Sequence, residues 1–285
     1  MVLFRRGMHF GSYGTVDDGA AVFGRLAEAV RAAEAAGFDA VSVPDHVHQN
    51  QVGGGPGSPM FDAYTLLGAL ALQTTTVRLF ALVSPVTLRH PGLLAKAVTT
   101  LDVLSHGRAV LGIGAGWDVA ESEAYGISFP SAGERFDRLE EALAICDALF
   151  TEGRATFSGK FYTMRDARNS PRPVSGTIPV LVAGGGERRT LDLVARYGDA
   201  CNVFAADPAE VRHKFEVLDR HCGRVGRDPL EITRTVFAAP PGDLGEFAAA
   251  ARSWAAAGAD GAVVIGPEDP ARIAAIGQVL GEVFA

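Results

Sequence analysis

The chain has 285 residues, of which 48% are hydrophobic and 21% are charged, and its formal net charge at pH 7 is −7. This apolar fraction is sufficient for a full core, and acidic residues spread along the chain argue against nucleic acid as a partner. The first residues, MVLFRRGMHFGSYG, contain no apolar run long enough for a signal peptide or a membrane span. We therefore expect a soluble, cytoplasmic protein.

Short apolar segments alternate with amphipathic segments along the whole chain. Strands are predicted at 8–10, 38–43, 77–83, 108–113, 178–183, 199–204, 231–237 and 260–265. Between and after them, helices are predicted at 23–33 (ended by Gly37), 62–73, 91–107, 131–150, 187–197, 208–225, 244–257 and 270–284. Residues 151–176 form an insertion in which ATFSGKFYTM predicts a β-hairpin.

The predicted strands are apolar on both faces, which is typical of a parallel sheet covered on both sides. Eight strand and helix units in 285 residues fit an α/β fold of the (β/α)8 TIM-barrel type. A doubly wound sheet is the alternative, but it usually has fewer units. No break in composition marks a boundary, so we expect residues 1–285 to form one domain.

Cysteine usage favours a reducing environment. The three cysteines are odd in number and lack CxxC spacing, which argues against a disulfide framework or a zinc site. Cys146 lies on the apolar stripe of a predicted helix and Cys201 in a predicted strand, so both are expected to fill the core.

Two glycine clusters could contact a cofactor. RAVLGIGAGWD resembles a dinucleotide fingerprint, but the third glycine of G-x-G-x-x-G would fall on Trp117. Glycines at the end of a barrel strand can instead allow a flat ligand to approach the backbone.

In AGGGERR, Gly184, Gly185 and Gly186 precede a helix, where free N–H groups can bind phosphate and Arg188 adds charge. A tight turn with surface arginines explains the same residues equally well.

Polar side chains follow several predicted strands, at the end of a barrel where active sites form. These are His9, Asp45, His46, Ser84, His90 and Trp117. Asp45 and His46 directly follow VSVP, and a histidine there can transfer a proton near neutral pH. Alternatively, Asp45 caps the following loop and His46 only bonds to backbone.

A metal site is the less favoured interpretation of the same segment. His46 and His48 have a spacing used by some barrel hydrolases, which also need carboxylate or lysine ligands at later strand ends. LVSP, GIGAG, LVAGGG and VVIGP provide none directly. We therefore expect no metal.

The motifs GFDAVSVPDHVH, LVSPVTLRHPGLLAKAVTTLDVLSHGRAVLGIGAGWDVAESE, FSGKFYTM and IPVLVAGGGERRTLDLVARYGDACNVF occur in a linked order. Together they resemble the luciferase-like superfamily, and within it the coenzyme F420-dependent oxidoreductases. The resemblance implies a (β/α)8 barrel with an insertion after the fourth helix, commonly a homodimer, with a deazaflavin or FMN at the carboxyl ends of the strands.

The resemblance also implies roles for particular residues. Asp45 and His46 would lie at the ring, with His46 as proton donor or ring contact. A non-proline cis peptide would fall near Ala81–Leu82, behind the ring. The remaining implied cofactor contacts are Ser84, Ala115, Gly116, Gly184, Gly185, Gly186 and Arg188.

Trp117 departs from the pattern, because sugar-phosphate dehydrogenases of this superfamily have a proton-transferring glutamate there. An indole cannot transfer that proton, and an aromatic wall suits an apolar or planar substrate. We therefore expect Trp117 and His9 in the substrate pocket and hydride transfer between F420 and an organic substrate, with His46 handling the proton. An FMN-dependent monooxygenase that uses O2 and a separate reductase is the main alternative, and a non-catalytic cofactor carrier is another.

Overall fold

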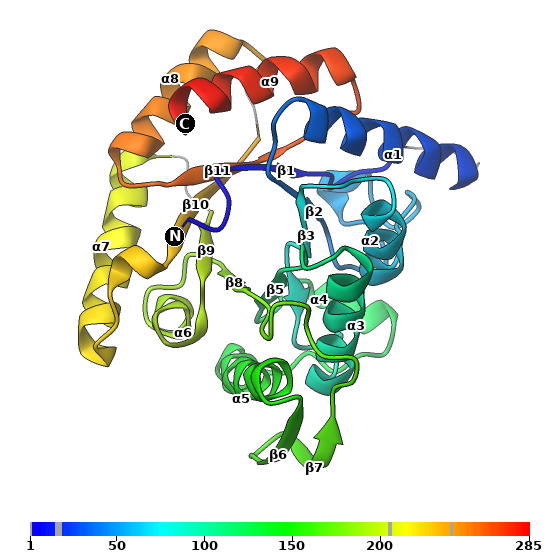
Figure 1. The fold of residues 1–285 in the computed structure, drawn as a ribbon, viewed down its shortest axis with the longest axis vertical. Helices are drawn as coiled ribbons and strands as arrows, with labels where there is room; N and C mark the ends of the chain where they lie inside the picture. The colour runs from blue at the N-terminus through cyan, green and yellow to red at the C-terminus, as the bar shows by residue number, and fades with distance from the viewer. Residues whose placement is uncertain (1, 15–18, 205–206, 240–241) are drawn as a thin grey trace.

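The computed structural model describes residues 2–14, 19–204, 207–239 and 242–285 (Figure 1). Parallel strands form the centre of the molecule, and helices surround them. The strands of the main sheet are β1 (Arg6–His9), β2 (Ala40–Val43), β3 (Arg78–Ala81), β4 (Ser84–Pro85), β5 (Leu111–Gly114), β8 (Val180–Ala183), β9 (Ala200–Val203), β10 (Thr233–Ala238) and β11 (Gly261–Ile265). Their order is β3-β2-β1-β11-β10-β9-β8-β5-β4.

The ring closes through the third strand position, which β3 and β4 share. Ser84 of β4 pairs with Ile113 of β5, and a parallel bridge joins Leu79 of β3 to Ala109 just before β5. With β3 and β4 counted as one position, the described sheet has the eight parallel positions that the sequence predicted. The (β/α)8 barrel is thus confirmed.

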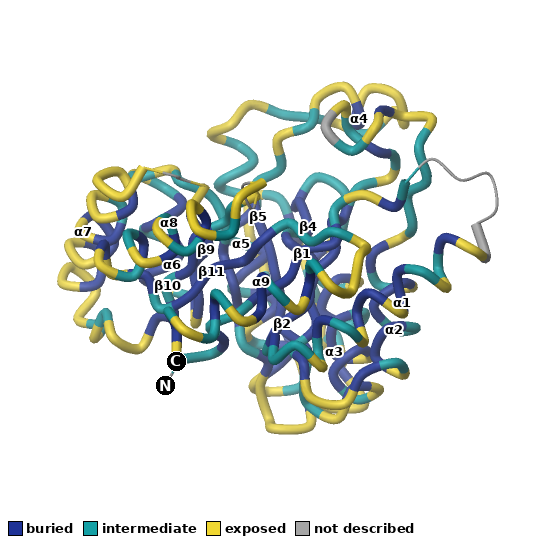
Figure 2. The backbone as a smooth tube through the Cα atoms, turned by 90° about the horizontal axis from the view of Figure 1, so that it is seen from above, coloured by how far each residue is buried: buried dark blue, intermediate teal, exposed yellow. Residues whose placement is uncertain are grey.

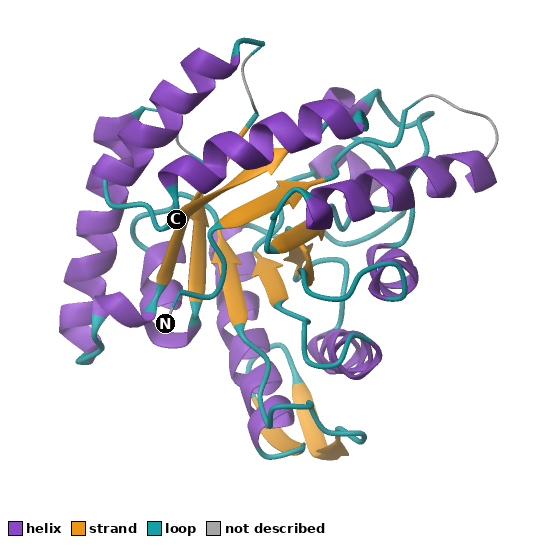
Figure 3. Ribbon diagram, turned by 45° about the horizontal axis from the view of Figure 1, so that its top comes forward, coloured by secondary structure: helices purple, strands orange, loops and turns teal. Residues whose placement is uncertain are grey.

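The helices follow the strands in the expected alternation (Figure 3). The helices that pack around the barrel are α1 (Gly19–Ala35), α2 (Ala63–Ala71), α3 (Pro91–Leu104), α5 (Ala132–Thr151), α6 (Thr190–Tyr197), α7 (Pro208–Val225), α8 (Leu244–Ala256) and α9 (Pro270–Val283). Local sequence determines where helices α7 and α9 begin. Asp207 and Asp269 each accept a backbone N–H as the N-cap residue, and the proline that follows has no N–H to satisfy at the first helical position. No helix in the described ranges is long and apolar enough to span a membrane.

Buried backbone lies at the centre of the molecule (Figure 2), and the described core residues form two clusters. One lies between the strands and the surrounding helices, and the other fills the barrel interior. The interior is formed mainly by Phe4, Ala40, Phe80, Leu82, Val110, Leu181, Ala200 and Val263. Cys146 and Cys201 are free and fully buried, as core filling requires.

Two segments lie outside the regular alternation. The predicted hairpin is present as β6 (Arg154–Ser158) and β7 (Thr163–Arg168), which project beyond α5 in Figure 1. The carboxylate of Glu141 on α5 accepts backbone N–H groups of Lys160, Phe161 and Tyr162 and so holds the hairpin turn. The short helix α4 (Val119–Ala124), between β5 and α5, was not predicted from the sequence. Two 3₁₀ turns, Gln51–Gly53 and Pro229–Glu231, complete the described elements.

Candidate active site

A cavity of about 470 Å³ lies where the parallel strands end. This is the face of a (β/α)8 barrel that carries the active site, and the volume is within the usual range for small-molecule pockets. Strand ends, α4, α5 and α6 supply its walls: His46, Leu82, Val83, Pro85, Thr87, Gly114, Ala115, Gly116, Trp117, Asp118, Glu121, Ser122, Phe129, Phe136, Leu139, Ala183, Gly184, Thr190 and Phe204.

The lining is largely aromatic and aliphatic, with few charges. Trp117 and Phe204 have 63% and 53% of their surface exposed, so large apolar rings stand at the cavity without burial in the core. The titratable lining residues are His46, Asp118 and Glu121, and the described lining includes no lysine or arginine. Such a wall favours an apolar or planar ligand over an anionic one.

The glycines of LGIGAG allow the neighbouring third strand to approach β5 closely. A Cβ on Gly112 would collide with the carbonyl oxygen of Ala81, and one on Gly114 would lie 2.8 Å from Cγ2 of Val83. Gly116 has φ +81°, which favours glycine. Gly114, Ala115 and Gly116 then present backbone to the cavity. The expectation of exposed backbone is therefore met, but Gly112 and Gly114 are also required because the third strand approaches so closely.

The third strand contains the non-proline cis peptide, at Leu82–Val83. This is one bond later than the expected Ala81–Leu82. Leu82 and Val83 line the cavity, whereas Ala81 is fully buried in the packing between barrel and helices.

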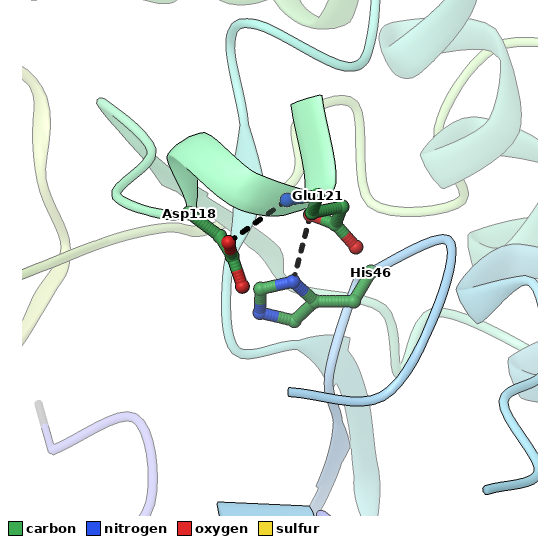
Figure 4. A group of neighbouring side chains, drawn as sticks. All are labelled: His46, Asp118 and Glu121. Carbon is green, nitrogen blue, oxygen red and sulfur yellow. Dashed lines mark hydrogen bonds and ion pairs between the residues drawn. The ribbon is translucent and has the colours of Figure 1, made fainter. Parts of the chain in front are cut away.

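His46 follows β2 and is bonded to a carboxylate that comes from α4 (Figure 4). Its Nδ1 lies 2.9 Å from Oε2 of Glu121. The other carboxylate oxygen of Glu121 accepts the backbone N–H groups of Val47 at 2.6 Å and His48 at 3.3 Å. An ionised carboxylate only accepts hydrogen bonds, so Nδ1 is the donor and Nε2 remains for the cavity that His46 lines.

The surroundings of His46 favour the imidazolium. Burial alone would lower the pKa of His46, but the hydrogen bond and charge of Glu121, with the charges of Asp118 and Asp45, outweigh it and raise the pKa. Burial works to raise the pKa of Glu121, and its contacts with His46 and the backbone N–H groups lower it overall. The two groups form an ion pair in which 13% of the His46 side chain and 2% of the Glu121 side chain are exposed.

Ligand-type atoms of His46, Asp118 and Glu121 all lie within 4.8 Å of one another, close enough for a metal ion (Figure 4). Several of these atoms already have other partners, because Nδ1 of His46 is bonded to Glu121 and Asp118 caps α4 by accepting the N–H of Glu121 at 3.0 Å. His48, the second histidine of the sequence motif, instead contacts the backbone oxygen of Gln49 and the ring of Tyr125. The spacing His46-x-His48 therefore does not build the cluster.

Asp45 is turned away from the cavity, although it precedes His46. Its carboxylate is 2% exposed and accepts two hydrogen bonds of 2.7 Å from Arg89 and one of 2.6 Å from Ser84. Arg89 also reaches Asp62 at 2.7 Å, and Tyr64 donates to the Ser84 hydroxyl at 2.9 Å. The structure thus places Asp45 and Ser84 in a buried network behind the strand ends, because the guanidinium binds the carboxylate on that side. The sequence led us to expect both residues at the cofactor, but neither lines the cavity.

His9 also lies below the cavity, within the barrel. Its Nδ1 is 3.0 Å from the Ser42 hydroxyl, and its ring lies edge-on to Phe237 at 5.4 Å. Burial, with the charge of His46, lowers the pKa of His9 to about 3, so this imidazole is neutral at physiological pH. His9 reaches the cavity only indirectly, through Phe237 and then Phe204.

The predicted phosphate loop meets the cavity at one end. Gly184 and Thr190 line it, whereas Gly185, Gly186 and the exposed Arg188 do not. Arg188 is exposed, and the neighbouring Arg189 bonds to Asp137 at 2.8 Å. Helix α6 has no side-chain N-cap, in contrast to α2, α3, α4, α5, α7, α8 and α9. The N–H of Leu191 is bonded to the carbonyl of Gly186 at 3.1 Å, and no side chain caps the rest of the first turn, where an anion could bind.

Several lining residues were missed from sequence. Glu121 and Asp118 belong to a D-x-x-E pattern that signals the start of a helix, but the pattern does not show that Glu121 turns to His46. Phe204 directly follows β9 and Thr190 begins α6, so both could be found only from their positions near strand ends.

Residues 2–261 match the family described as luciferase-like monooxygenase. The chain belongs to this family. Within it, the F420-dependent glucose-6-phosphate dehydrogenase of Beutenbergia cavernae is 32% identical over 253 residues, which cover 87% of this chain and 74% of that protein.

Two solved structures share the luciferase-like barrel along nearly the whole chain. The coenzyme F420-dependent tetrahydromethanopterin reductase of Methanopyrus kandleri has a TM-score of 0.80 at 17% identity and 99% coverage of both chains. The EDTA monooxygenase of Chelativorans sp. BNC1 has a TM-score of 0.81 at 15% identity, covering 99% of this chain and 95% of that one. At these identities the two structures bear on the fold.

Proposed function

We propose that this luciferase-like protein is an oxidoreductase that transfers hydride between coenzyme F420 and an unphosphorylated, apolar or planar organic substrate. The observation that carries the proposal is the cavity itself, in which one imidazole stands in an aromatic and backbone-lined wall at the carboxyl ends of the strands. The name of the Beutenbergia relative supports F420 as the cofactor.

The residues present fit a deazaflavin. Gly114, Ala115 and Gly116 offer a wall with little side-chain volume, against which a flat ring can lie. The uncapped start of α6, reached through Gly184 and Thr190, suits the phosphate of the ribityl chain. When bound, the deazaflavin supplies the hydride chemistry.

The protein's own contribution is to orient the ligands, exclude water and move one proton. The aromatic rings of Trp117, Phe129 and Phe204 cover apolar ligand surface. His46 holds the exchangeable proton at Nε2, because its Nδ1 is bonded to Glu121. A homodimer and a separate reductase remain predictions from the family resemblance.

The charge of the lining bears on the substrate. The start of α6 is assigned above to the cofactor phosphate. A second phosphate, on the substrate, would normally need lysine or arginine; the described lining contains neither, and Asp118 and Glu121 would repel it. We therefore expect no turnover of glucose 6-phosphate, the substrate in the name of the Beutenbergia relative.

The proposal is tested by titrating the purified protein with F420 and, separately, with FMN, while cofactor fluorescence is followed. We expect micromolar binding of F420 and substrate-dependent oxidation of reduced F420 across a panel of apolar carbonyl and enone compounds. In the His46→Ala variant, turnover should fall about 100-fold or more, while the Kd for F420 changes little. Binding of FMN alone would instead favour the monooxygenase, and unchanged turnover in His46→Ala would remove His46 from the mechanism.

A further inference from the structure

Among the residues that the structure describes, the carboxylate of Glu121 is the one hydrogen-bonded to the imidazole of His46, and it reaches across from α4 to the loop after β2. On the basis of the proposed function, we infer that Glu121 is the positioning residue for His46: it keeps the proton on Nδ1 and thereby makes Nε2 the atom that exchanges a proton with the substrate.

The geometry leaves the Glu121 carboxylate little freedom. Oε2 is 2.9 Å from Nδ1 of His46, and Oε1 accepts the N–H groups of Val47 and His48. Both oxygens are therefore occupied, and the group is 2% exposed. The two backbone bonds prevent rotation, so the carboxylate fixes both the ring and the loop that carries it.

The other charged groups near His46 are committed elsewhere. Asp118 lies on the same helix and accepts the N–H of Glu121, while Asp45 is bonded to Arg89 and Ser84. His9 approaches from β1 and is neutral. Trp117 contacts the imidazole edge-on, with ring centroids 5.6 Å apart, and has no carboxylate to offer. Of the groups described around His46, Glu121 is the one placed both to accept the hydrogen bond from Nδ1 and to balance the imidazolium charge.

Replacement of Glu121 by glutamine removes the negative charge and the acceptor that faces Nδ1 of His46, while the packing around the side chain is kept. The side chain keeps its size, and an amide oxygen still accepts from the Val47 and His48 N–H groups. The amide NH₂ then faces Nδ1 of His46 and donates to it, which requires Nδ1 to be unprotonated and places the single ring proton on Nε2. Nitrogen chemical shifts of the imidazole distinguish the two tautomers.

The experiment compares the wild type with Glu121→Gln and with Glu123→Gln, a matched control at an exposed position of α4. In free protein, ¹⁵N NMR of the histidine rings should show Nδ1 protonated in the wild type and the control. In Glu121→Gln, Nδ1 should lose its proton and the midpoint of the His46 titration should move to lower pH.

In F420 turnover, Glu121→Gln should lower kcat about 10- to 100-fold with the Kd for F420 within about twofold. The alkaline limb of the kcat profile should shift to lower pH, and Glu121→Gln should have no added effect in a His46→Ala background. Glu121→Asp, which keeps the charge, should restore part of the loss and serves as the second variant if Glu121→Gln fails to fold.

Unchanged His46 nitrogen shifts and an unchanged pH profile in Glu121→Gln would overturn the inference, as would an additive loss in the His46→Ala background. Because the NMR measurement needs no cofactor or substrate, it decides the role of Glu121 even if F420 turnover is absent. If F420 turnover is absent while the NMR results for His46 are as expected, the proposed function is refuted but the role of Glu121 in positioning His46 is supported.

Discussion

Replacement of Arg89 by methionine should lower the free energy of unfolding more than a substitution at an exposed position nearby. Methionine keeps most of the length of the side chain but removes both hydrogen bonds of 2.7 Å to Asp45. The Asp45 carboxylate would then keep only the Ser84 hydroxyl as a partner and would remain 2% exposed.

Loss of one partner from a buried ion pair typically costs about 3–5 kcal/mol, because the remaining charge stays desolvated. The Arg89 side chain is itself 24% exposed, so water can reach the vacated space, and we expect a loss near the lower limit, about 3 kcal/mol. This corresponds to a change on the order of a hundredfold in the folding equilibrium.

Asp62→Asn provides the matched comparison. Asp62 is 50% exposed and also bonds to Arg89, and asparagine can still cap α2. Its loss should be below about 1 kcal/mol, as for other exposed pairs. The free energies of unfolding can be measured by urea titration with far-ultraviolet circular dichroism.

The double variant Asp45→Asn/Arg89→Met tests the cause. Removal of both charges should recover about half or more of the loss, since no desolvated charge remains. If Arg89→Met costs no more than Asp62→Asn, or if the double variant is less stable than Arg89→Met alone, then the Asp45 carboxylate is not the buried, paired charge that we describe.

Two further predictions concern titratable groups. The fold raises the pKa of His46 above its ordinary value of 6.5 and lowers the pKa of Glu121 below its ordinary value of 4.5. Their ion pair therefore stabilises the fold fully between pH 4.5 and 6.5. This stabilisation is lost as the pH rises through the pKa of His46 in the folded protein, or falls through that of Glu121. The difference in unfolding free energy between wild type and Glu121→Gln should therefore be largest in that interval and smaller at alkaline pH, and a difference that grows above pH 8 would contradict the assignment. Burial raises the pKa of the Cys146 and Cys201 thiols to about 12 and also raises that of Cys222, so native protein should react with a thiol reagent far more slowly than urea-unfolded protein. Rapid labelling of the native state would contradict the buried positions.

The barrel could be predicted from sequence because its signals are local and repeated. Apolar strands occur in every unit, aspartate–proline starts mark the helices α7 and α9, and the structure keeps the predicted order of strands and helices. The short helix α4 was missed because six residues carry too little periodicity to separate a helix from a loop.

The position of the candidate site could be predicted from the sequence, but the directions and partners of its side chains could not. Asp45 and His46 are neighbours at one strand end, yet only His46 lines the cavity, because Arg89 binds Asp45 on the opposite side. The partner of His46 was equally hidden, since Glu121 lies 75 residues further along the chain. Pairings of this kind depend on tertiary packing, which strand-end position alone does not encode.

The contact of Gly112 and Gly114 with Ala81 and Val83 limits how the cavity can change during evolution or design. A side chain on Gly112 would strike the backbone carbonyl of Ala81, which no other substitution can remove, whereas one on Gly114 would strike the side chain of Val83 and would need a paired change there. Trp117, by contrast, stands on a connection beyond the strands and is largely exposed. New substrate preferences are therefore more accessible through single changes at the rim than through changes at the floor.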